Sequence, residues 1–289
     1  MIYLSSFTFP SMQTQEGFLI EEKHTCYDSF YPFKVLDAGR LEFEPITILY
    51  GNNGSGKTTA LNVMAEALKL KRDSLYNRSN FFEDYIKRCD FNLLNALPDV
   101  SSVITSDDVF DFMFTLRSVN EDIDEKREEL MDDYTSTKYS NFKFRTMDDY
   151  EQLKKVNLSR RKSKSQYVRN SLMDNVQENS NGESAFKYFV NKIGENGLFL
   201  LDEPENSLSP SKQLELIEHI KDSARFFGCQ FIIATHSPFL LSIEGAKIYD
   251  LDSKPPVVKN WTELENVRVY YDFFKKNENN SGLMFFWIF

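Results

Sequence analysis

The chain has 289 residues, which is enough for one large domain or two modest ones. Its net charge of −10 argues against a surface that is generally coated with nucleic acid. No run of about 18 apolar residues occurs, so we expect no insertion into a membrane. The N-terminus lacks the pattern of a secretion signal and the cysteines are scattered, which together predict a cytoplasmic protein.

Short strands are expected over residues 1–50, and the last of them leads into a glycine-rich loop. The expected strands cover residues 2–7, 18–21, 41–43 and 46–50. Directly after them stands a complete Gly-x-x-x-x-Gly-Lys-Thr phosphate loop, made of Gly51, Asn52, Asn53, Gly54, Ser55, Gly56, Lys57, Thr58 and Thr59. Apolar residues then recur with helical spacing, at Leu61, Met64, Ala65 and Leu68. A strand before and a helix after are the context that this motif requires.

The residue types in this loop suit the binding of a nucleoside triphosphate. The glycines let backbone N–H groups curl around the phosphates, and the N-terminus of the following helix adds its partial positive charge. Lys57 would reach the β- and γ-phosphates, and Thr58 would offer its hydroxyl to Mg²⁺. The loop therefore predicts a triphosphate site with a magnesium ion.

The middle of the chain, residues 71–178, reads as mainly helical, with charged helices near 107–134 and 147–158. Its length is too short for a long coiled coil. The acidic stretch 121–133 alone would make only about 20 Å of helix at 1.5 Å per residue. We therefore expect a compact helical lid.

A basic run follows the acidic stretch. Residues 154–169 contain seven Lys or Arg residues and no acid. Such a run forms a solvated helix face, binds nucleic acid or meets the acidic stretch within the lid, and the sequence leaves these alternatives open.

Residues 197–204 read Gly-Leu-Phe-Leu-Leu-Asp-Glu-Pro, an apolar strand that ends in two acids. This is the Walker B pattern, in which an acid at the end of a buried strand faces the metal held over the phosphate loop. Asp202 is the candidate Mg²⁺ ligand, acting mostly through water. Glu203 is the candidate general base that orients the attacking water.

A third block, residues 231–238, is another buried strand that is closed by Thr-His-Ser-Pro. A helix-length segment separates it from Glu203, which is the spacing of a βαβ unit, so both strand ends should share one sheet edge. His236 is a candidate member of the catalytic set there, because a histidine at a strand end can sense a γ-phosphate by hydrogen bonding.

The last core strand is expected over residues 248–251. Asp250 and Asp252 are assigned to its end and not to a nuclease metal site, because no further cluster of acids or histidines accompanies them. Beyond the strand, residues 253–289 contain Phe273, Phe274 and a strongly apolar stretch over 284–289. An exposed stretch of that kind would be sticky, so we expect this tail to pack on the core or on a partner.

Residues 46–70 and 179–252 together resemble the ABC-type ATPases of the AAA kind, above all the soluble SMC-like and RecF-like branch. The resemblance implies an α/β P-loop NTPase of ABC-ATPase type, with a mostly parallel core sheet, an antiparallel N-terminal β part and a helical lid insertion. The nucleotide-binding core would comprise residues 1–70 and 179–252, the lid 71–178, and the tail 253–289.

The resemblance also assigns residues outside the phosphate loop. Asn-Ser-Asn-Gly-Glu at 179–183 looks like the family's signature motif, which opens a helix and binds the γ-phosphate of ATP held by the other subunit. The residues concerned are Ser180, Gly182 and Glu183. The segment 205–210 looks like the family's D-loop, in which Ser207 and Ser209 would face the second subunit. The family's Q-loop glutamine is missing, since no Gln occurs from residue 58 to 151, and Asn80 is a candidate substitute.

The function that the resemblance implies is that of a molecular switch. Two subunits would sandwich two ATP molecules with Mg²⁺ in a head-to-tail homodimer, and ATP hydrolysis would let them part. A separately encoded effector would provide the output, in bacterial DNA maintenance or defence against phage, and residues 154–169 could contact nucleic acid. The alternatives are the ATPase subunit of a membrane transporter, which the missing glutamine disfavours, and an ATP-held scaffold with little turnover.

Overall fold

The computed structural model describes residues 1–11, 13–14, 17, 38–74, 82–169, 171–173 and 181–277. The chain divides into two compact units, of which unit 1 comprises Met1–Phe110 with Asn181–Phe289 and unit 2 comprises Asp111–Ser180. The lid expected over residues 71–178 starts earlier than unit 2 does, because the segment before Asp111 contributes two strands to the sheets of unit 1.

Unit 1 is built on a six-stranded sheet with the strand order β5-β6-β7-β3-β8-β9. Its strands are β3 (Ile46–Tyr50), β5 (Ser102–Thr105), β6 (Leu198–Asp202), β7 (Gln230–Ala234), β8 (Lys247–Asp250) and β9 (Val257–Val258). Neighbouring strands pair in parallel, except that β9 is antiparallel to β8. Every residue of β3, β6 and β7 is buried, as expected for central strands that are covered on both faces.

The register of the parallel strands brings their carboxyl ends to one edge of the sheet. Ala234 lies opposite Asp202 on one side and opposite Leu49 on the other. Tyr50 lies opposite Asp250. The loops that leave β3, β6, β7 and β8 therefore start side by side, and ligand sites of open α/β sheets are formed at such an edge.

A three-stranded antiparallel sheet with the order β2-β1-β4 forms the second β part of unit 1. Its strands are β1 (Leu4–Thr8), β2 (Arg40–Glu42) and β4 (Asp90–Leu93). The two sheets confirm the predicted α/β class with an antiparallel N-terminal part. The strand expected over 18–21 lies outside the described residues.

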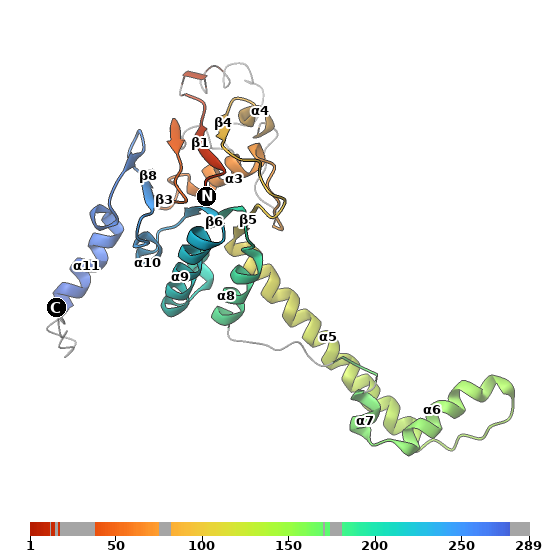
Figure 1. Cartoon of the computed structure of the whole chain (residues 1–289). Coiled ribbons are helices and arrows are strands. Elements are labelled where there is room, and N and C mark those ends of the chain that lie inside the picture. Colours follow the sequence, from red (N-terminus) through yellow and green to blue (C-terminus); the bar gives the residue numbers. More distant parts are fainter. Residues whose placement is uncertain are drawn as a thin grey trace. The chain divides into compact units, whose positions relative to one another are not determined.

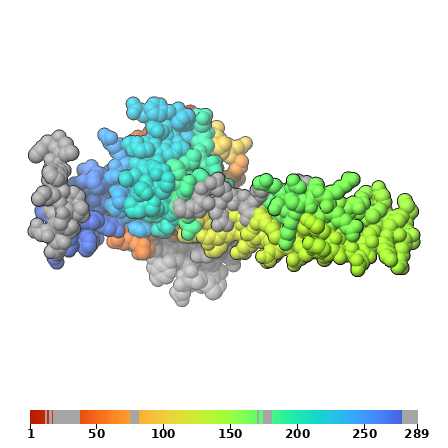
Figure 2. All heavy atoms as spheres, turned by 90° about the horizontal axis from the view of Figure 1, so that it is seen from below, coloured from red at the N-terminus to blue at the C-terminus, as the bar shows by residue number. Residues whose placement is uncertain are grey.

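Helices cover both faces of the parallel sheet. α3 (Lys57–Ala67) lies on the side of the antiparallel sheet, whereas α8 (Asn181–Lys192) and α9 (Pro210–Phe226) lie on the other side (Figure 1). Figure 2 looks onto this second layer, where the side chains of α8 and α9 cover the sheet. One buried apolar cluster joins both sheets to α3 and includes Phe7, Met64 and Leu200. The shorter helices of unit 1 are α4 (Phe82–Ile86), η3 (Pro204–Ser207), α10 (Pro238–Leu241) and η4 (Trp261–Glu263).

The described part of the tail contains α11 (Glu265–Asn277). Asn266 joins this helix to the sheet edge: its backbone N–H donates to the Tyr50 hydroxyl at 3.2 Å, and its side-chain amide donates to the carbonyl of His236. The aromatic side chains of Tyr271 and Phe274 on α11 are largely exposed. The apolar stretch 284–289 lies outside the described residues, so its docking stays a prediction.

Unit 2 contains most of α5 (Ser106–Lys138), together with η2 (Met147–Asp149), α6 (Tyr150–Arg161) and α7 (Lys164–Arg169). The 33 residues of α5 span about 50 Å at 1.5 Å per residue. The helix agrees with the charged helix predicted near 107–134, and its buried side chains extend from Val109 to Tyr134. No helix among the described residues, α5 included, is long and apolar enough to cross a membrane.

The acidic helix and the basic run meet within unit 2. The Tyr167 hydroxyl of α7 donates to a carboxylate oxygen of Asp133 at 2.9 Å, and the Tyr134 hydroxyl donates to the Lys162 carbonyl at 3.0 Å. The rings of Tyr134 and Tyr167 also pack with their centroids 5.5 Å apart. Six of the seven basic side chains nevertheless stay exposed, and only Lys162 is partly covered. A solvated basic face and a contact with the acidic helix therefore coexist.

Candidate functional site

The phosphate loop connects β3 to α3 and depends on glycine at three positions. Gly54 and Gly56 have φ angles of 84° and 94°, in the left-handed region that favours glycine. A Cβ atom on Gly51 would lie 2.4 Å from Ser55 Oγ and 3.3 Å from Asp252 Oδ1, so a side chain does not fit there. The backbone N–H of Ser55 donates to the Asn52 carbonyl at 3.0 Å, which closes the turn.

Lys57 is the first residue of α3, and its side chain is buried beneath the loop. Its ammonium group donates to the carbonyls of Gly51 at 2.7 Å and Asn52 at 3.2 Å. The same Nζ atom lies 3.8 Å from Oε1 of Glu203. The structure therefore brings the lysine of the phosphate loop next to the Walker B pair, although the two are far apart in the sequence.

Thr58 and Asp202, the two predicted magnesium ligands, are in direct contact. The Thr58 hydroxyl donates to Oδ1 of Asp202 at 3.1 Å. The pKa of Asp202 is raised to about 7, mainly by burial and also by the charge of Glu203, although the hydrogen bond from Thr58 and the charge of Lys57 oppose the rise. A hydroxyl and a carboxylate side by side are the hard oxygen ligands that Mg²⁺ prefers, so these residues fit the predicted ion.

Glu203 directly follows β6 and adopts a backbone conformation that is unusual for its residue type. Its φ of 47° and ψ of 52° are left-handed, and for a residue with a Cβ such a conformation costs on the order of 1–3 kcal/mol. The turn directs the side chain toward Lys57. Asn206 supports it, because its side-chain amide donates to Oε2 of Glu203 at 3.0 Å. A strained backbone at this residue is typical of functional sites.

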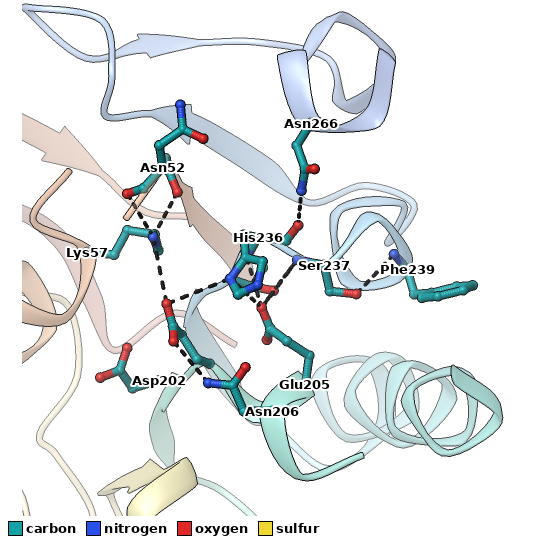
Figure 3. Close-up of polar contacts among 12 residues, drawn as sticks. Asn52, Lys57, Asp202, Glu205, Asn206, His236, Ser237, Phe239 and Asn266 are labelled. Carbon is teal, nitrogen blue, oxygen red and sulfur yellow. Dashed lines mark hydrogen bonds and ion pairs between the residues drawn. The ribbon is translucent and has the colours of Figure 1, made fainter. Parts of the chain in front are cut away.

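His236 follows β7 and lies between two glutamates. Its Nδ1 atom is 3.7 Å from Oε1 of Glu203 and 3.2 Å from Oε1 of Glu205. Figure 3 shows Lys57, Asp202 and His236 in this site, with the carboxylate of Glu205 below the imidazole of His236. The predicted catalytic pair, Glu203 and His236, is thus close together.

The signature residues that the structure describes belong to the start of α8 and are not among the contacts of Lys57, Glu203 and His236 described above. Ser180 is outside the described residues, as is Asn80, the candidate substitute in the Q-loop. Gly182 and Glu183 are in the first turn of α8, where a Cβ on Gly182 would lie 3.8 Å from the backbone nitrogen of Ser209. Glu183 lies 3.4 Å from Nζ of Lys187. The structure describes one chain, so their contact with ATP held by a second chain stays a prediction.

The sequence does not predict the roles of two site residues. It indicates Glu205 only as the first residue of the expected D-loop, whereas the structure places its carboxylate against the loop that contains His236. It indicates Asp252 only as a strand end, whereas both carboxylate oxygens accept from the backbone N–H of Asn52, at 3.1 and 2.9 Å. The available signal for Asp252 was its position just after β8, because β8 neighbours β3 and its end lies beside the phosphate loop.

The fold is that of a P-loop NTPase of ABC-ATPase type, because the phosphate loop and the Walker B acids leave two parallel strands, β3 and β6, that flank β7 and end at one edge of the sheet. Residues 188–242 match the family described as "AAA domain, putative AbiEii toxin, Type IV TA system". That segment contains Asp202, Glu203 and His236. The family match over this segment supports an ATPase domain of the AAA kind, in agreement with the predicted class.

Two solved structures are among those that this chain is similar to. One is a nucleotide-free ATP-binding cassette from an ABC transporter, with 14% identity, a TM-score of 0.43 and coverage of 98% of this chain and 100% of that one. The other is the Smc head domain with an extended coiled coil bound to the C-terminal domain of ScpA, from Pyrococcus furiosus, with 12% identity, a TM-score of 0.43 and coverage of 94% and 100%. A search of curated proteins gives no match.

Proposed function

We propose that two copies of this chain bind two molecules of MgATP between them, head to tail, and that ATP hydrolysis lets them separate. The observation that carries the proposal is the position of Glu203, whose Oε1 lies 3.8 Å from Lys57 Nζ and 3.7 Å from His236 Nδ1. Phosphoryl transfer requires positioning and charge neutralisation more than covalent chemistry, and these three side chains provide both.

Each residue of the site has a distinct part in this proposal. Lys57 leaves the loop carbonyls to neutralise the β- and γ-phosphates, and bound Mg²⁺ supplies further charge neutralisation beside Thr58 and Asp202. Glu203 accepts a proton from the attacking water. His236 donates a hydrogen bond to the γ-phosphate. The second copy closes the site with its signature motif, through Ser180, Gly182 and Glu183.

Two substitutions test the proposal, with phosphate release and ATP binding measured separately. Lys57→Ala should abolish ATP binding, because no other side chain of the phosphate loop is cationic. Glu203→Gln should retain ATP binding, lower turnover by about 100-fold or more and trap a dimer, because ATP is bound but not hydrolysed. Light scattering with and without ATP reports the dimer.

Lys221→Ala provides the matched control for charge removal, since Lys221 pairs with Glu218 on the surface of α9. It should leave binding and turnover unchanged. Hydrolysis by Glu203→Gln at the wild-type rate would contradict the assignment of the base. A monomeric Glu203→Gln protein in saturating ATP would contradict the sandwich, and wild-type binding without turnover would identify the ATP-held scaffold.

The output of the switch is proposed to reside in a separately encoded effector, in bacterial defence or DNA maintenance. The description of the matched family names a toxin of a type IV toxin–antitoxin system, which supports the defence role. Purification of the tagged chain from its own host, followed by identification of the proteins that accompany it, tests this. A soluble effector is the expected result, whereas a multi-spanning membrane protein would support the transporter alternative.

A further inference from the structure

The carboxylate of Glu205 organises the loop that contains His236. Glu205 is only 7% exposed. Its Oε1 atom accepts three hydrogen bonds from consecutive residues, namely from the Thr235 hydroxyl at 2.7 Å, the His236 N–H at 2.9 Å and the Ser237 N–H at 3.2 Å. Hydrogen bonds to an ionised acceptor are the stronger ones. One carboxylate oxygen therefore determines the backbone path at the histidine.

The same carboxylate also lies against the histidine ring. His236 Nδ1 is 3.2 Å from Oε1 of Glu205. The second oxygen, Oε2, is buried and has no hydrogen-bond partner among the described residues. A buried polar atom without a partner is costly, so the presence of a glutamate here is explained by the contacts of Oε1 and not by packing alone.

A second side chain links this loop to α9 and the expected D-loop. The Ser237 hydroxyl donates to Gln213 Oε1 at 2.6 Å, and Gln213 Nε2 donates to the Leu208 carbonyl at 3.1 Å. Gln213 is also buried. Glu205 and Gln213 thus connect the segment after β6 to the segment after β7 at two points, through groups that are shielded from water.

We propose that Glu205 is a positioning residue for His236 and that it thereby couples the expected D-loop, residues 205–210, to the proposed γ-phosphate sensor. The proposal rests on the proposed function, because His236 has its sensing role only in an ATPase. In this proposal Glu205 acts through His236 and not directly on the nucleotide. A displacement of segment 205–210, which is expected to face the second subunit, would move His236 with it, so that dimer contact and phosphate sensing change together.

A double-mutant cycle tests whether Glu205 acts through His236. We expect Glu205→Ala to lower kcat for ATP hydrolysis by about tenfold or more, with the KM for ATP changed less than about twofold. In the His236→Ala background the same substitution should lower kcat by less than about twofold, because coupled residues are not additive. If the losses of kcat in the two single variants multiply in the double variant, the proposal is overturned, since this would indicate two independent effects.

Glu205→Gln is a second variant that preserves the shape of the side chain. It keeps an acceptor oxygen but removes the charge, so kcat should fall by less than in Glu205→Ala. Glu218→Gln is the matched control, because Glu218 is an exposed carboxylate on α9 that pairs with Lys221. It should leave kcat unchanged. An equal fall of kcat in Glu205→Gln and in the control Glu218→Gln would contradict a specific role for Glu205.

A measurement without turnover separates this proposal from the proposed function. The chain has three histidines, so the ring Cε1–H signal of His236 can be identified by nuclear magnetic resonance as the one that His236→Ala removes. Glu205→Ala should shift this signal, whereas Glu218→Gln should not. An unmoved signal overturns the positioning role even if ATP is hydrolysed. If the wild-type protein lacks ATPase activity but Glu205→Ala still shifts the His236 signal, the proposed function is refuted while the contact between Glu205 and His236 is supported.

Discussion

Asp202 and Glu203 are adjacent acids with different environments, and the difference decides what each can do. Asp202 is 9% exposed at the end of a strand that is buried throughout. Glu203 turns away through its left-handed backbone into the space between Lys57 and His236. A buried carboxyl suits a ligand whose charge a metal ion compensates, whereas a carboxylate beside open space can reach a water molecule.

The acidity of Asp202 predicts how stability depends on pH when no metal is bound. Burial raises the pKa of this carboxyl to about 7, while in the unfolded chain it is about 3.9. Between these values the folded state binds the proton that the unfolded state has lost, so the free energy of unfolding should fall as pH rises toward 7. The slope should approach about 1.4 kcal/mol per pH unit.

Asp202→Asn removes this titration and serves as the comparison. Urea unfolding of both proteins in a chelator, from pH 5 to 8, should show the variant gaining stability relative to the wild type until pH 7 and remaining level above it. A difference in the free energy of unfolding between the two proteins that does not vary with pH would contradict a buried, protonated Asp202. The gain would accompany a loss of Mg²⁺-dependent function, as is common for residues in active sites.

Among the elements of unit 1, a single polar side chain, that of Gln230, joins the antiparallel sheet to the parallel sheet. Gln230 is the first residue of β7 and is completely buried. Its Oε1 accepts from the N–H groups of Tyr3 and Leu4 at 2.8 and 2.9 Å. Its Nε2 donates to the carbonyls of Leu4 at 2.8 Å and Glu44 at 3.3 Å. The antiparallel sheet is thereby attached to the parallel sheet that forms the site.

Gln230→Leu should therefore destabilise unit 1 strongly. The substitution leaves two buried N–H groups and at least one buried carbonyl without a partner, and each such group costs about 1–3 kcal/mol. We expect a loss of about 3 kcal/mol or more in the free energy of unfolding, measured in urea. Gln152→Leu on the exposed face of α6 is the matched control and should change stability by less than about 0.5 kcal/mol. Equal effects would show that the four hydrogen bonds do not stabilise the fold.

At the scale of the whole molecule, unit 2 is the part with a charge pattern suited to a partner. The chain is acidic overall, with a net charge of −10, yet α6 and α7 expose basic side chains that include Arg160 and Arg161. Phosphate backbones attract such local clusters even on acidic proteins. Contact between unit 2 and nucleic acid is therefore a prediction about this surface and does not depend on the catalytic residues.

Replacing Arg160, Arg161 and Lys162 together by Ala tests this contact. We expect DNA to raise the ATPase rate of the wild-type chain and to have little effect on the triple variant, whose rate without DNA should be unchanged. The stimulation should weaken as salt increases, because bound counterions are released on binding. Lys275→Ala with Lys276→Ala, on exposed positions of α11, is the control. A wild-type rate that no form of DNA alters would contradict direct binding.

The local sequence determined the elements of the nucleotide site. The phosphate loop, the apolar strand before Asp202 and the strand before His236 were readable because their signals are short: glycines at fixed spacing, or a run of apolar residues that ends in a polar one. The βαβ spacing then predicted that these ends meet at one edge, and the parallel register of β3, β6 and β7 has this arrangement.

Only the tertiary structure decided which side chains support the site. Glu205 contacts Thr235, His236 and Ser237 across separations of 30 to 32 residues, and Asp252 contacts Asn52 across 200 residues. A carboxylate that accepts from a distant backbone N–H leaves no periodic pattern in its own neighbourhood, so both residues looked like ordinary loop acids. Likewise, the burial of Gln230 follows from the packing of two sheets, which no local stretch of sequence specifies.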